Sequence, residues 1–247
     1  MMIAELIDSD DLALLENGLV EKGIPNTYFV TEQMLFFMDM TLQCNEVINL
    51  TTITEPREFI RKHFLDALFC YGWQEIEAAE RIVDVGTGAG IPGIPLAMAY
   101  PEKQFLLMDS LSKRIGFLQT AVDAMGLSNV SVMHMRAEDA GRNPKYREKY
   151  DLCVSRALAK LPVLSEYCLP LVRPGGYFYA YKTDNALGEI VDSETARKLL
   201  GAPGEVLVRA ADAKASLYRH NIMVIKKELR TPETYPRKAG TPAKVPL

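Results

Sequence analysis

The clearest indication of the fold lies in residues 81–90, which read Arg81-Ile82-Val83-Asp84-Val85-Gly86-Thr87-Gly88-Ala89-Gly90. A short apolar run leads directly into three closely spaced glycines, which is the pattern of a buried strand that turns sharply into a helix. Glycine suits such a turn because a side chain would hold the backbone away from a ligand. In open α/β sheets, ligands bind at the carboxyl ends of the strands. The stretch therefore predicts a ligand site at the end of the first strand of an α/β sheet.

Six further apolar runs follow the first at intervals typical of a sheet. Helical stretches over 112–125 and 160–171 separate some of them, and strands that alternate with helices favour a parallel sheet covered on both faces. The last two runs fit a closing hairpin, so we expect an α/β fold with a mostly parallel seven-stranded sheet. The predicted strands are 82–85, 105–108, 130–133, 152–154, 176–181, 206–208 and 222–225.

The first 75 residues read as helices. Met34, Phe37 and Met38 recur at helical spacing, and Thr31 is the expected cap of that helix. Pro56 opens a second helix, since proline is tolerated in a first turn. The expected organisation is an N-terminal helical extension over 1–75, a Rossmann-like domain over 76–230 and an irregular basic tail over 231–247.

The glycine spacing indicates which cofactor the turn would hold. A dinucleotide site has the pattern Gly-x-Gly-x-x-Gly and holds a pyrophosphate, whereas this chain has Gly-x-Gly-x-Gly with Asp84 two residues upstream. An acidic residue repels a pyrophosphate but suits the ammonium group of S-adenosylmethionine. Asp109, at the end of the second strand, is placed to accept from ribose hydroxyls. We therefore predict an S-adenosylmethionine site; a tight turn without a ligand and an NAD site are the alternatives. The loop residues expected at this site are Asp84, Gly86, Gly88 and Gly90.

The composition is ordinary for a globular protein, with 48% hydrophobic and 24% charged residues. No apolar run approaches the roughly 18 residues that span a bilayer. The first eleven residues lack the basic region of a signal peptide. The four cysteines are far apart and form no Cys-x-x-Cys pair, so we expect neither a metal site nor a redox couple.

The charge is unevenly distributed, although the whole chain has a net charge of −4. Residues 209–247 hold nine Lys/Arg and three Asp/Glu, which leaves 19 Lys/Arg and 29 Asp/Glu in the first 208 residues. Such asymmetry hints at a local surface that binds anions, although a basic tail can also be merely solvated.

Several motifs together resemble one family over nearly the whole chain. The resemblance rests on 49–51 with 63–68, on 84–95, on Ser155-Arg156-Ala157 and on the tail 235–242. The chain resembles the bacterial small-subunit ribosomal RNA methyltransferase G family, also called glucose-inhibited division protein B. The resemblance implies a class I methyltransferase fold, S-adenosylmethionine as cofactor, and methylation of N7 of one guanine in 16S rRNA near the decoding centre. It further implies a cytoplasmic monomer whose partner is 16S rRNA in the 30S subunit or an assembly intermediate. Onto this sequence it carries cofactor contacts at Gly86, Ile91, Asp109, Ser110, Leu111, Ala137, Glu138 and Arg156.

Methyl transfer to guanine N7 requires no general base, because N7 carries a free lone pair and no proton. The chain lacks the Asn/Asp-Pro-Pro-aromatic motif used on exocyclic amines and the Pro-Cys pair used on pyrimidine carbons. Alignment of the two partners is then the main task, and we expect Arg156 to orient the cofactor or the base. The residues expected to contact RNA phosphates are Lys182, Lys226, Lys227, Arg230, Arg237, Lys238 and Lys244.

Besides a ribosomal RNA methyltransferase, two other interpretations of these features remain open. A small-molecule methyltransferase of the same fold would not need the basic tail. An NAD-dependent oxidoreductase, or an RNA-binding scaffold with a vestigial cofactor site, belongs to a different class. Binding assays with S-adenosylmethionine and with NAD separate this different class from the two methyltransferases.

Overall fold

The computed structural model of the protein describes residues 7–183, 186–210 and 220–247. Its centre is one seven-stranded sheet with the strand order β3-β2-β1-β4-β5-β7-β6. Strands β1 to β5 run parallel, whereas β7 is antiparallel to both β5 and β6. This arrangement confirms the predicted fold class, including the antiparallel pairing of the last two strands. The strands are β1 Arg81–Val85, β2 Gln104–Asp109, β3 Val130–His134, β4 Tyr150–Arg156, β5 Val172–Thr183, β6 Val206–Ala210 and β7 His220–Lys226.

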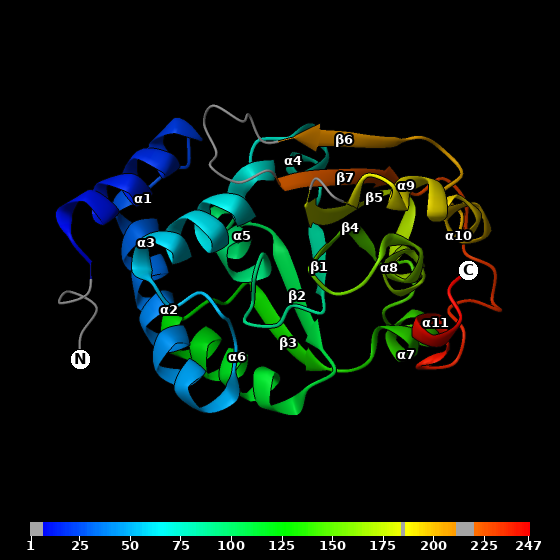
Figure 1. Ribbon diagram of the computed structural model, residues 1–247, viewed down its shortest axis with the longest axis horizontal. Helices are drawn as coiled ribbons and strands as arrows, with labels where there is room; N and C mark the ends of the chain where they lie inside the picture. The colour runs from blue at the N-terminus through cyan, green and yellow to red at the C-terminus, as the bar shows by residue number, and fades with distance from the viewer. Residues whose placement is uncertain (1–6, 184–185, 211–219) are drawn as a thin grey trace.

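Helices cover both faces of the sheet, as Figure 1 shows. Those before the sheet are α1 Ser9–Glu21, α2 Thr27–Ile48, α3 Pro56–Phe59, the π-helix η2 Ile60–Leu65, the 3₁₀ turn η3 Leu68–Cys70 and α4 Gln74–Glu77. Those between the strands are α5 Gly93–Ala99, α6 Ser112–Met125, α7 Ala137–Arg142, α8 Leu161–Cys168, η4 Leu169–Leu171, α9 Glu189–Asp192 and α10 Glu194–Leu199. The last helix, α11, spans Thr241–Lys244.

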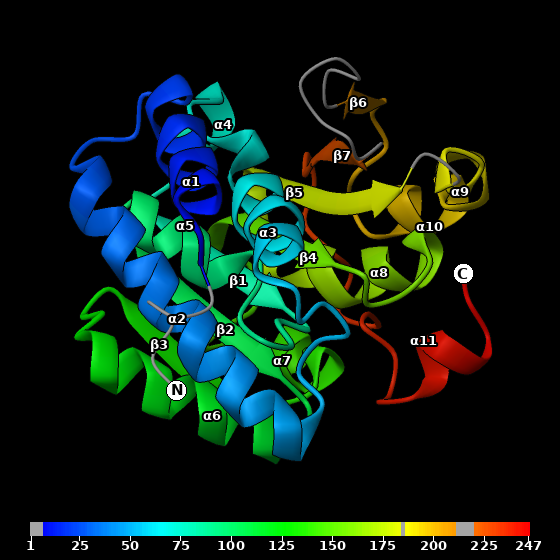
Figure 2. The same cartoon turned by 60° about the vertical axis from the view of Figure 1, so that its left-hand side comes forward.

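The two sides of the sheet have different origins in the sequence. In Figures 1 and 2, α1 and α2 lie on the same side of the sheet as α5 and α6, whereas α11 and the C-terminus lie on the other side with α7 and α8. Helix α2 packs on α5 and α6, and α11 packs on α8. The N-terminal helices and the C-terminal segment therefore enclose the sheet from opposite faces.

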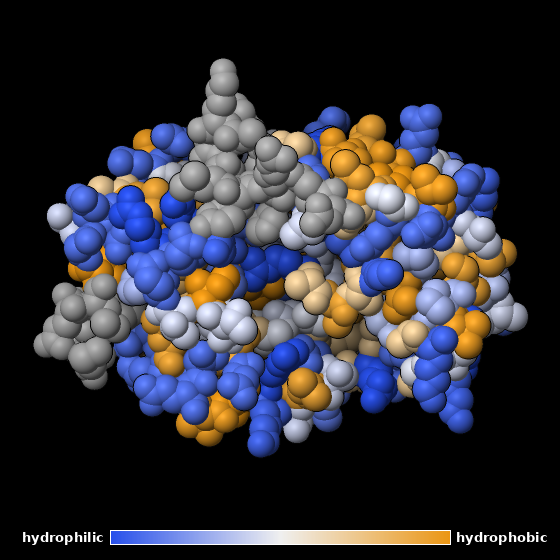
Figure 3. Space-filling view, viewed as in Figure 1, coloured by the Kyte–Doolittle hydropathy of each residue, from blue (hydrophilic) through white to orange (hydrophobic). Residues whose placement is uncertain are grey.

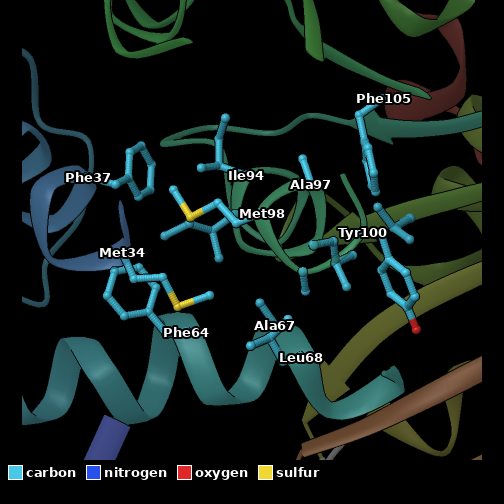
Figure 4. Close-up of a cluster of buried hydrophobic side chains, with 14 of the residues drawn as sticks. Met34, Phe37, Phe64, Ala67, Leu68, Ile94, Ala97, Met98, Tyr100 and Phe105 are labelled. Atoms are coloured by element: carbon cyan, nitrogen blue, oxygen red, sulfur yellow. The ribbon is translucent and has the colours of Figure 1, made fainter. Parts of the chain in front are cut away.

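The core divides into two clusters because successive side chains of a strand point to opposite faces. Ile82 and Leu107 belong to the cluster under the N-terminal helices, whereas Val83 and Leu106 belong to the one under α8 and α10. Figure 4 shows the first cluster, in which side chains from α2, the 56–70 segment and α5 meet. Its labelled members are Met34, Phe37, Phe64, Ala67, Leu68, Ile94, Ala97, Met98, Tyr100 and Phe105. Burial on both faces explains why the central strands β1, β2 and β4 read as continuous apolar runs.

The predicted start of helix α2 was wrong. The helix begins at Thr27, behind Asn26 in a left-handed conformation with φ 52°, so Thr31 lies inside the helix. The Thr31 side chain is buried, and its hydroxyl has no hydrogen-bond partner among the described residues. The Pro56 prediction was correct: Pro56 opens α3, and the Glu55 carboxylate caps this helix through the backbone N–H groups of Arg57 and Glu58.

No helix in the described ranges is both long and apolar enough to cross a bilayer.

Candidate active site

The glycine loop leaves β1 through three residues with positive φ. Gly86, Gly88 and Gly90 have φ of 70°, 60° and 91°, a region that glycine enters at no steric cost. Gly86 N and Thr87 N both donate to the Met108 carbonyl of β2, at 2.9 and 3.0 Å. The loop is therefore fixed to the neighbouring strand, and it lies at the carboxyl edge of the sheet.

Asp84 braces this loop from inside the protein. Its Oδ2 accepts from Thr87 Oγ1 at 2.7 Å and from Gly93 N at 2.9 Å, and the residue is fully buried. Burial raises the pKa of this carboxyl to about 7, and its Oδ1 has no partner among the described residues. Asp84 lines none of the three cavities described below. The expected direct contact with a cofactor ammonium group is therefore replaced by a role in holding the loop.

A first cavity of about 230 Å³ opens beside the loop, between the ends of β2 and β3. It suits a nucleoside, because Met108, Leu111 and Leu158 offer apolar walls and Asp109 offers a carboxylate. The predicted cofactor residues that line it are Gly86, Asp109, Ser110, Leu111, Ala137 and Glu138. A Cβ at Gly86 would come within 2.6 Å of Leu158 Cδ2, so only glycine leaves this wall in place.

Two carboxylates of this cavity are held by backbone N–H groups. Asp109 Oδ2 accepts from Gly88 N at 3.0 Å, and its Oδ1 accepts from Leu111 N at 2.9 Å. Glu138 Oε1 accepts from Gly240 N at 2.8 Å, and Glu138 is only 3% exposed. The C-terminal segment thus reaches the wall of the first cavity, a contact between residues 102 positions apart that no local pattern indicates.

A second cavity of about 180 Å³ lies over the glycine loop. Gly86 lines both the first and the second cavity, so the two adjoin at this residue. Gly88, Ile91 and Arg156 also line the second cavity, as predicted for a cofactor site. Gly90 lines none of the three cavities. A Cβ there would meet Ile94 of α5 and Leu118 of α6 at 2.7 Å, so Gly90 allows close packing of the loop on these two helices.

A third and larger cavity, of about 590 Å³, adjoins the second. The two share the residues His63, Arg156 and Ala157, which form the wall between them. Figure 3 shows that the face of the molecule seen in Figure 1 is hollowed near its centre. The three cavities follow one another from the end of β3 to the end of β5.

Arg156 joins the end of β4 to the helical segment 60–66. Its Nη1 donates to the Lys62 carbonyl at 2.7 Å and to Asp66 Oδ2 at 3.3 Å, and its Nη2 donates to His63 Nδ1 at 2.9 Å. A planar guanidinium can make all three bonds at once. The predicted orienting residue thus also fixes the wall between the second and third cavities.

These contacts determine the tautomer of His63. Arg156 can only donate, so Nδ1 accepts and the ring proton lies on Nε2, which bonds Thr51 Oγ1 at 2.8 Å. Burial, followed by the charge of Arg156, lowers the pKa of His63 to about 3. His63 is therefore neutral near pH 7, and both of its ring nitrogens are engaged. The role of Thr51 was not predicted, since a threonine in a polar segment carries no distinctive signal.

The basic residues expected to contact RNA have diverse environments. Lys226, Arg230, Lys238 and Lys244 are exposed. Lys227 is completely buried: its Nζ donates to the Leu169 carbonyl at 2.7 Å and to Thr231 Oγ1, and burial lowers its pKa to about 8. The prediction for Lys227 is therefore wrong, because no phosphate can reach a side chain sealed inside the protein.

Two other expected RNA contacts already have acidic partners. Arg237 forms a bidentate ion pair with Glu166, whose side chain is 1% exposed. Lys182 pairs with Glu189 at 2.7 Å inside the third cavity. Over the described residues, no group of three or more His, Cys, Asp or Glu side chains could hold a metal ion.

Comparisons with known proteins point to one family. The family model described as rRNA small subunit methyltransferase G matches residues 30–220. A protein of that name from Alkaliphilus oremlandii is 44% identical over 95% of this chain and 98% of its own length. Another of that name, from Lachnoclostridium phytofermentans, is 43% identical over 93% of this chain and 95% of its own length.

Solved structures support the fold. The O-methyltransferase from Bacillus cereus in complex with S-adenosylhomocysteine has a TM-score of 0.51 at 17% identity, covering 77% of this chain and 90% of that one. The S-adenosylmethionine-dependent methyltransferase SibL has a TM-score of 0.54 at 13% identity, covering 86% and 77%. The chain has the Rossmann-like fold of S-adenosylmethionine-dependent methyltransferases, and it belongs to the rRNA small subunit methyltransferase G family.

Proposed function

We propose that this protein transfers a methyl group from S-adenosylmethionine to N7 of a guanine in 16S ribosomal RNA. The observation that carries the proposal is the row of three cavities, in which Arg156 and His63 separate the space over the glycine loop from the third cavity. Family membership supports the choice of ribosomal RNA as the acceptor. The partner would be 16S rRNA within the small subunit or one of its assembly intermediates, bound by a cytoplasmic monomer.

The residues present fit S-adenosylmethionine. The first cavity combines apolar walls with the Asp109 carboxylate, which suits a base and a ribose, and Ala137 and Glu138 also line it. The second cavity is more polar and runs over the backbone of Gly86 and Gly88, which suits the amino-acid part of the cofactor. When bound, S-adenosylmethionine supplies a methyl group on a positively charged sulfur.

The chain's own residues would act mainly by alignment. Arg156 fixes the carbonyl of Lys62 and the ring of His63, so the wall between the second and third cavities is rigid. A rigid wall restricts where an acceptor in the third cavity meets the cofactor side, and such alignment can supply several kcal/mol of the barrier. In this arrangement residues 1–75 are an extension that contributes part of that wall, 76–230 are the methyltransferase domain and 231–247 are its tail.

The protonation states at the wall suit an acceptor atom that has no proton to lose. His63 is the only imidazole among the described residues that line these three cavities, and both of its nitrogens already make hydrogen bonds. Its pKa of about 3 is also far below the value near 7 that favours a general base at neutral pH. Guanine N7 fits this arrangement because it attacks through a lone pair.

The test is to incubate the protein with labelled S-adenosylmethionine and unmodified 30S subunits. Any 7-methylguanosine is then mapped in 16S rRNA by borohydride reduction and aniline cleavage. We expect label at a single guanine. Label on a pyrimidine or an adenine, or on no ribosomal RNA at all, would overturn the proposal.

A further inference from the structure

The third cavity contains a lysine–glutamate pair for which the transfer reaction itself provides no role. Lys182 and Glu189 line this cavity and neither of the other two. The cavity volume of about 590 Å³ lies within the range of sites that enclose small organic groups. It can therefore hold a nucleobase that has left its helix, which is how enzymes that modify bases gain access to them.

The pair is held in a fixed geometry. Lys182 Nζ donates to Glu189 Oε2 and to the Ala159 carbonyl, both at 2.7 Å. Glu189 Oε2 also accepts from Leu161 N at 2.6 Å. The two side chains are 10% and 19% exposed. These contacts engage two of the three ammonium protons, and in the described part of the chain no hydrogen bond reaches Glu189 Oε1.

The pair lines the third cavity but is not part of the wall that it shares with the second, which indicates the edge of a base that the pair would meet. His63, Arg156 and Ala157 form the wall toward the cofactor side, and Lys182 and Glu189 lie elsewhere in the same cavity. A guanine whose N7 faces the shared wall presents its six-membered ring to the rest of the cavity. That ring carries O6, an acceptor, next to N1–H and the N2 amino group, which are donors.

We propose that Lys182 and Glu189 select guanine, with the Lys182 ammonium donating to O6 and the Glu189 carboxylate accepting from N1–H and the N2 amino group. A cation beside a carboxylate matches an acceptor beside donors. Adenine reverses the pattern, because it has a donor amino group at position 6 and an acceptor at N1. The ammonium would then face a donor and the carboxylate would face a lone pair, so adenine is rejected. This inference rests on the proposed function and adds a selecting pair to it.

The test compares guanosine with inosine at the methylated position. Inosine keeps N7, O6 and N1–H but lacks the N2 amino group. 30S particles are reconstituted with 16S rRNA that is ligated to carry either nucleoside, and kcat/KM is measured for each. A site built to bond a polar group rejects an analogue without it, so we expect the wild type to prefer guanosine by roughly 10- to 100-fold. Glu189→Ala should reduce this preference to about twofold or less.

The ratio of the two rates is independent of how much of the variant is folded, since the same preparation meets both substrates. Asp192→Asn, at an exposed position in the same helix α9, is the matched control and should keep the wild-type preference. The inference is overturned if Glu189→Ala keeps the preference, or if the wild type methylates both nucleosides equally well. A wild type that methylates no guanine N7 would remove the proposed function and the selecting pair together. A wild type that methylates guanine, with a ratio unchanged by Glu189→Ala, would remove the pair alone.

Discussion

Positively charged side chains have different roles in two regions of the molecule. One region is the C-terminal segment, residues 227–247, and the other is the cavity edge, the carboxyl edge of the sheet along which the three cavities lie. In the C-terminal segment, Arg237 closes on the buried Glu166, and Lys227 is sealed against Leu169 and Thr231. Arg147 donates to the carbonyls of Gly141, Tyr235, Thr231 and Pro232, which ties residues 231–236 to the loop after α7. These cations fasten the segment to the protein.

At the cavity edge, Arg156 and Lys182 also have partners, but their contacts form the walls of the second and third cavities. The positively charged side chains here line cavities and are not used only to hold one segment against another. A count of charges along the chain treats both regions alike, since it registers neither burial nor the partner. Substitutions in the two regions should therefore have different effects.

The largest effect is expected at the cavity edge. Arg156→Ala should lower kcat/KM for methyl transfer by about 100-fold or more, as for the loss of one well-placed donor, because the wall of Lys62 and His63 loses its anchor. Arg156→Lys should not restore the rate, since an ammonium cannot make the three bonds of the planar guanidinium. The measurement is methyl transfer to 30S subunits, with the cofactor Kd from calorimetry.

Arg57→Ala is the matched control for that prediction. Arg57 pairs with Asp11 at 2.7 Å in the N-terminal extension and lines none of the three cavities. It should leave the rate within about twofold. Full activity of Arg156→Ala with an unchanged cofactor Kd would contradict the role of Arg156 in holding the wall between the second and third cavities.

In the C-terminal segment the expected effect is on stability. Arg237→Ala leaves the carboxylate of Glu166 buried without its ion-pair partner, which costs about 3 kcal/mol in the free energy of unfolding. Urea denaturation measures this value. Lys198→Ala removes an exposed pair with Glu194 and should leave the free energy of unfolding almost unchanged, because exposed ion pairs contribute little to stability. A stable Arg237→Ala variant that binds RNA weakly would instead assign Arg237 to the RNA surface.

Much of the fold could be predicted because the central strands β1, β2 and β4 are buried on both faces. Continuous apolar runs and the glycine turn located the strands, and helix 112–125 was predicted with its observed bounds. The start of α2 was misplaced because the left-handed Asn26 begins the helix without a side-chain cap. Asparagine is itself a common N-cap residue, but Asn26 makes no side-chain cap bond, so residue type alone cannot choose between Asn26 and Thr31 as the start.

Residues of the candidate site could be predicted where their position follows from the order of the strands. They could not be predicted where the burial of a side chain depends on tertiary packing. The positions of Gly86, Asp109 and Glu138 at one cavity follow from the strand order. Lys227 shows the limit, since its sequence neighbour Lys226 is exposed while Lys227 has no exposed surface. The contact of Glu138 with Gly240 depends on how the end of the chain folds back, and nothing in the local pattern encodes it.

A pH dependence should appear on the cavity side and should depend on His63. Its pKa is about 3 in the folded protein and about 6.5 when exposed, so the unfolded chain binds the proton first as the pH falls. The His63 contribution to stability is therefore present above about pH 6.5 and is lost toward pH 3, by on the order of a few kcal/mol. Asp84 acts in the opposite direction, because its raised pKa makes its contribution fall as the pH rises from 3.8 to about 7.

The variant His63→Gln separates the two groups. Glutamine keeps a donor and an acceptor but does not titrate, while Asp84 is the same in both proteins. The difference in unfolding free energy between wild type and His63→Gln should thus change across pH 3 to 6.5 and be constant above it. A constant difference over the whole range would mean that His63 is not held neutral.

The smallest effect is expected on the salt dependence of RNA binding, at two adjacent residues of the C-terminal segment. Lys238 is exposed, whereas Arg237 beside it is engaged by Glu166. If Lys238 contacts an RNA phosphate, Lys238→Gln should reduce the slope of log K against log salt by about 0.7–0.9 and leave the unfolding free energy unchanged. Arg237→Ala, assayed under conditions where it is folded, should leave the slope unchanged. If Arg237→Ala reduced the slope and Lys238→Gln did not, the ion pair between Arg237 and Glu166 would have to open when RNA binds. Arg237 would then contact RNA as well as Glu166.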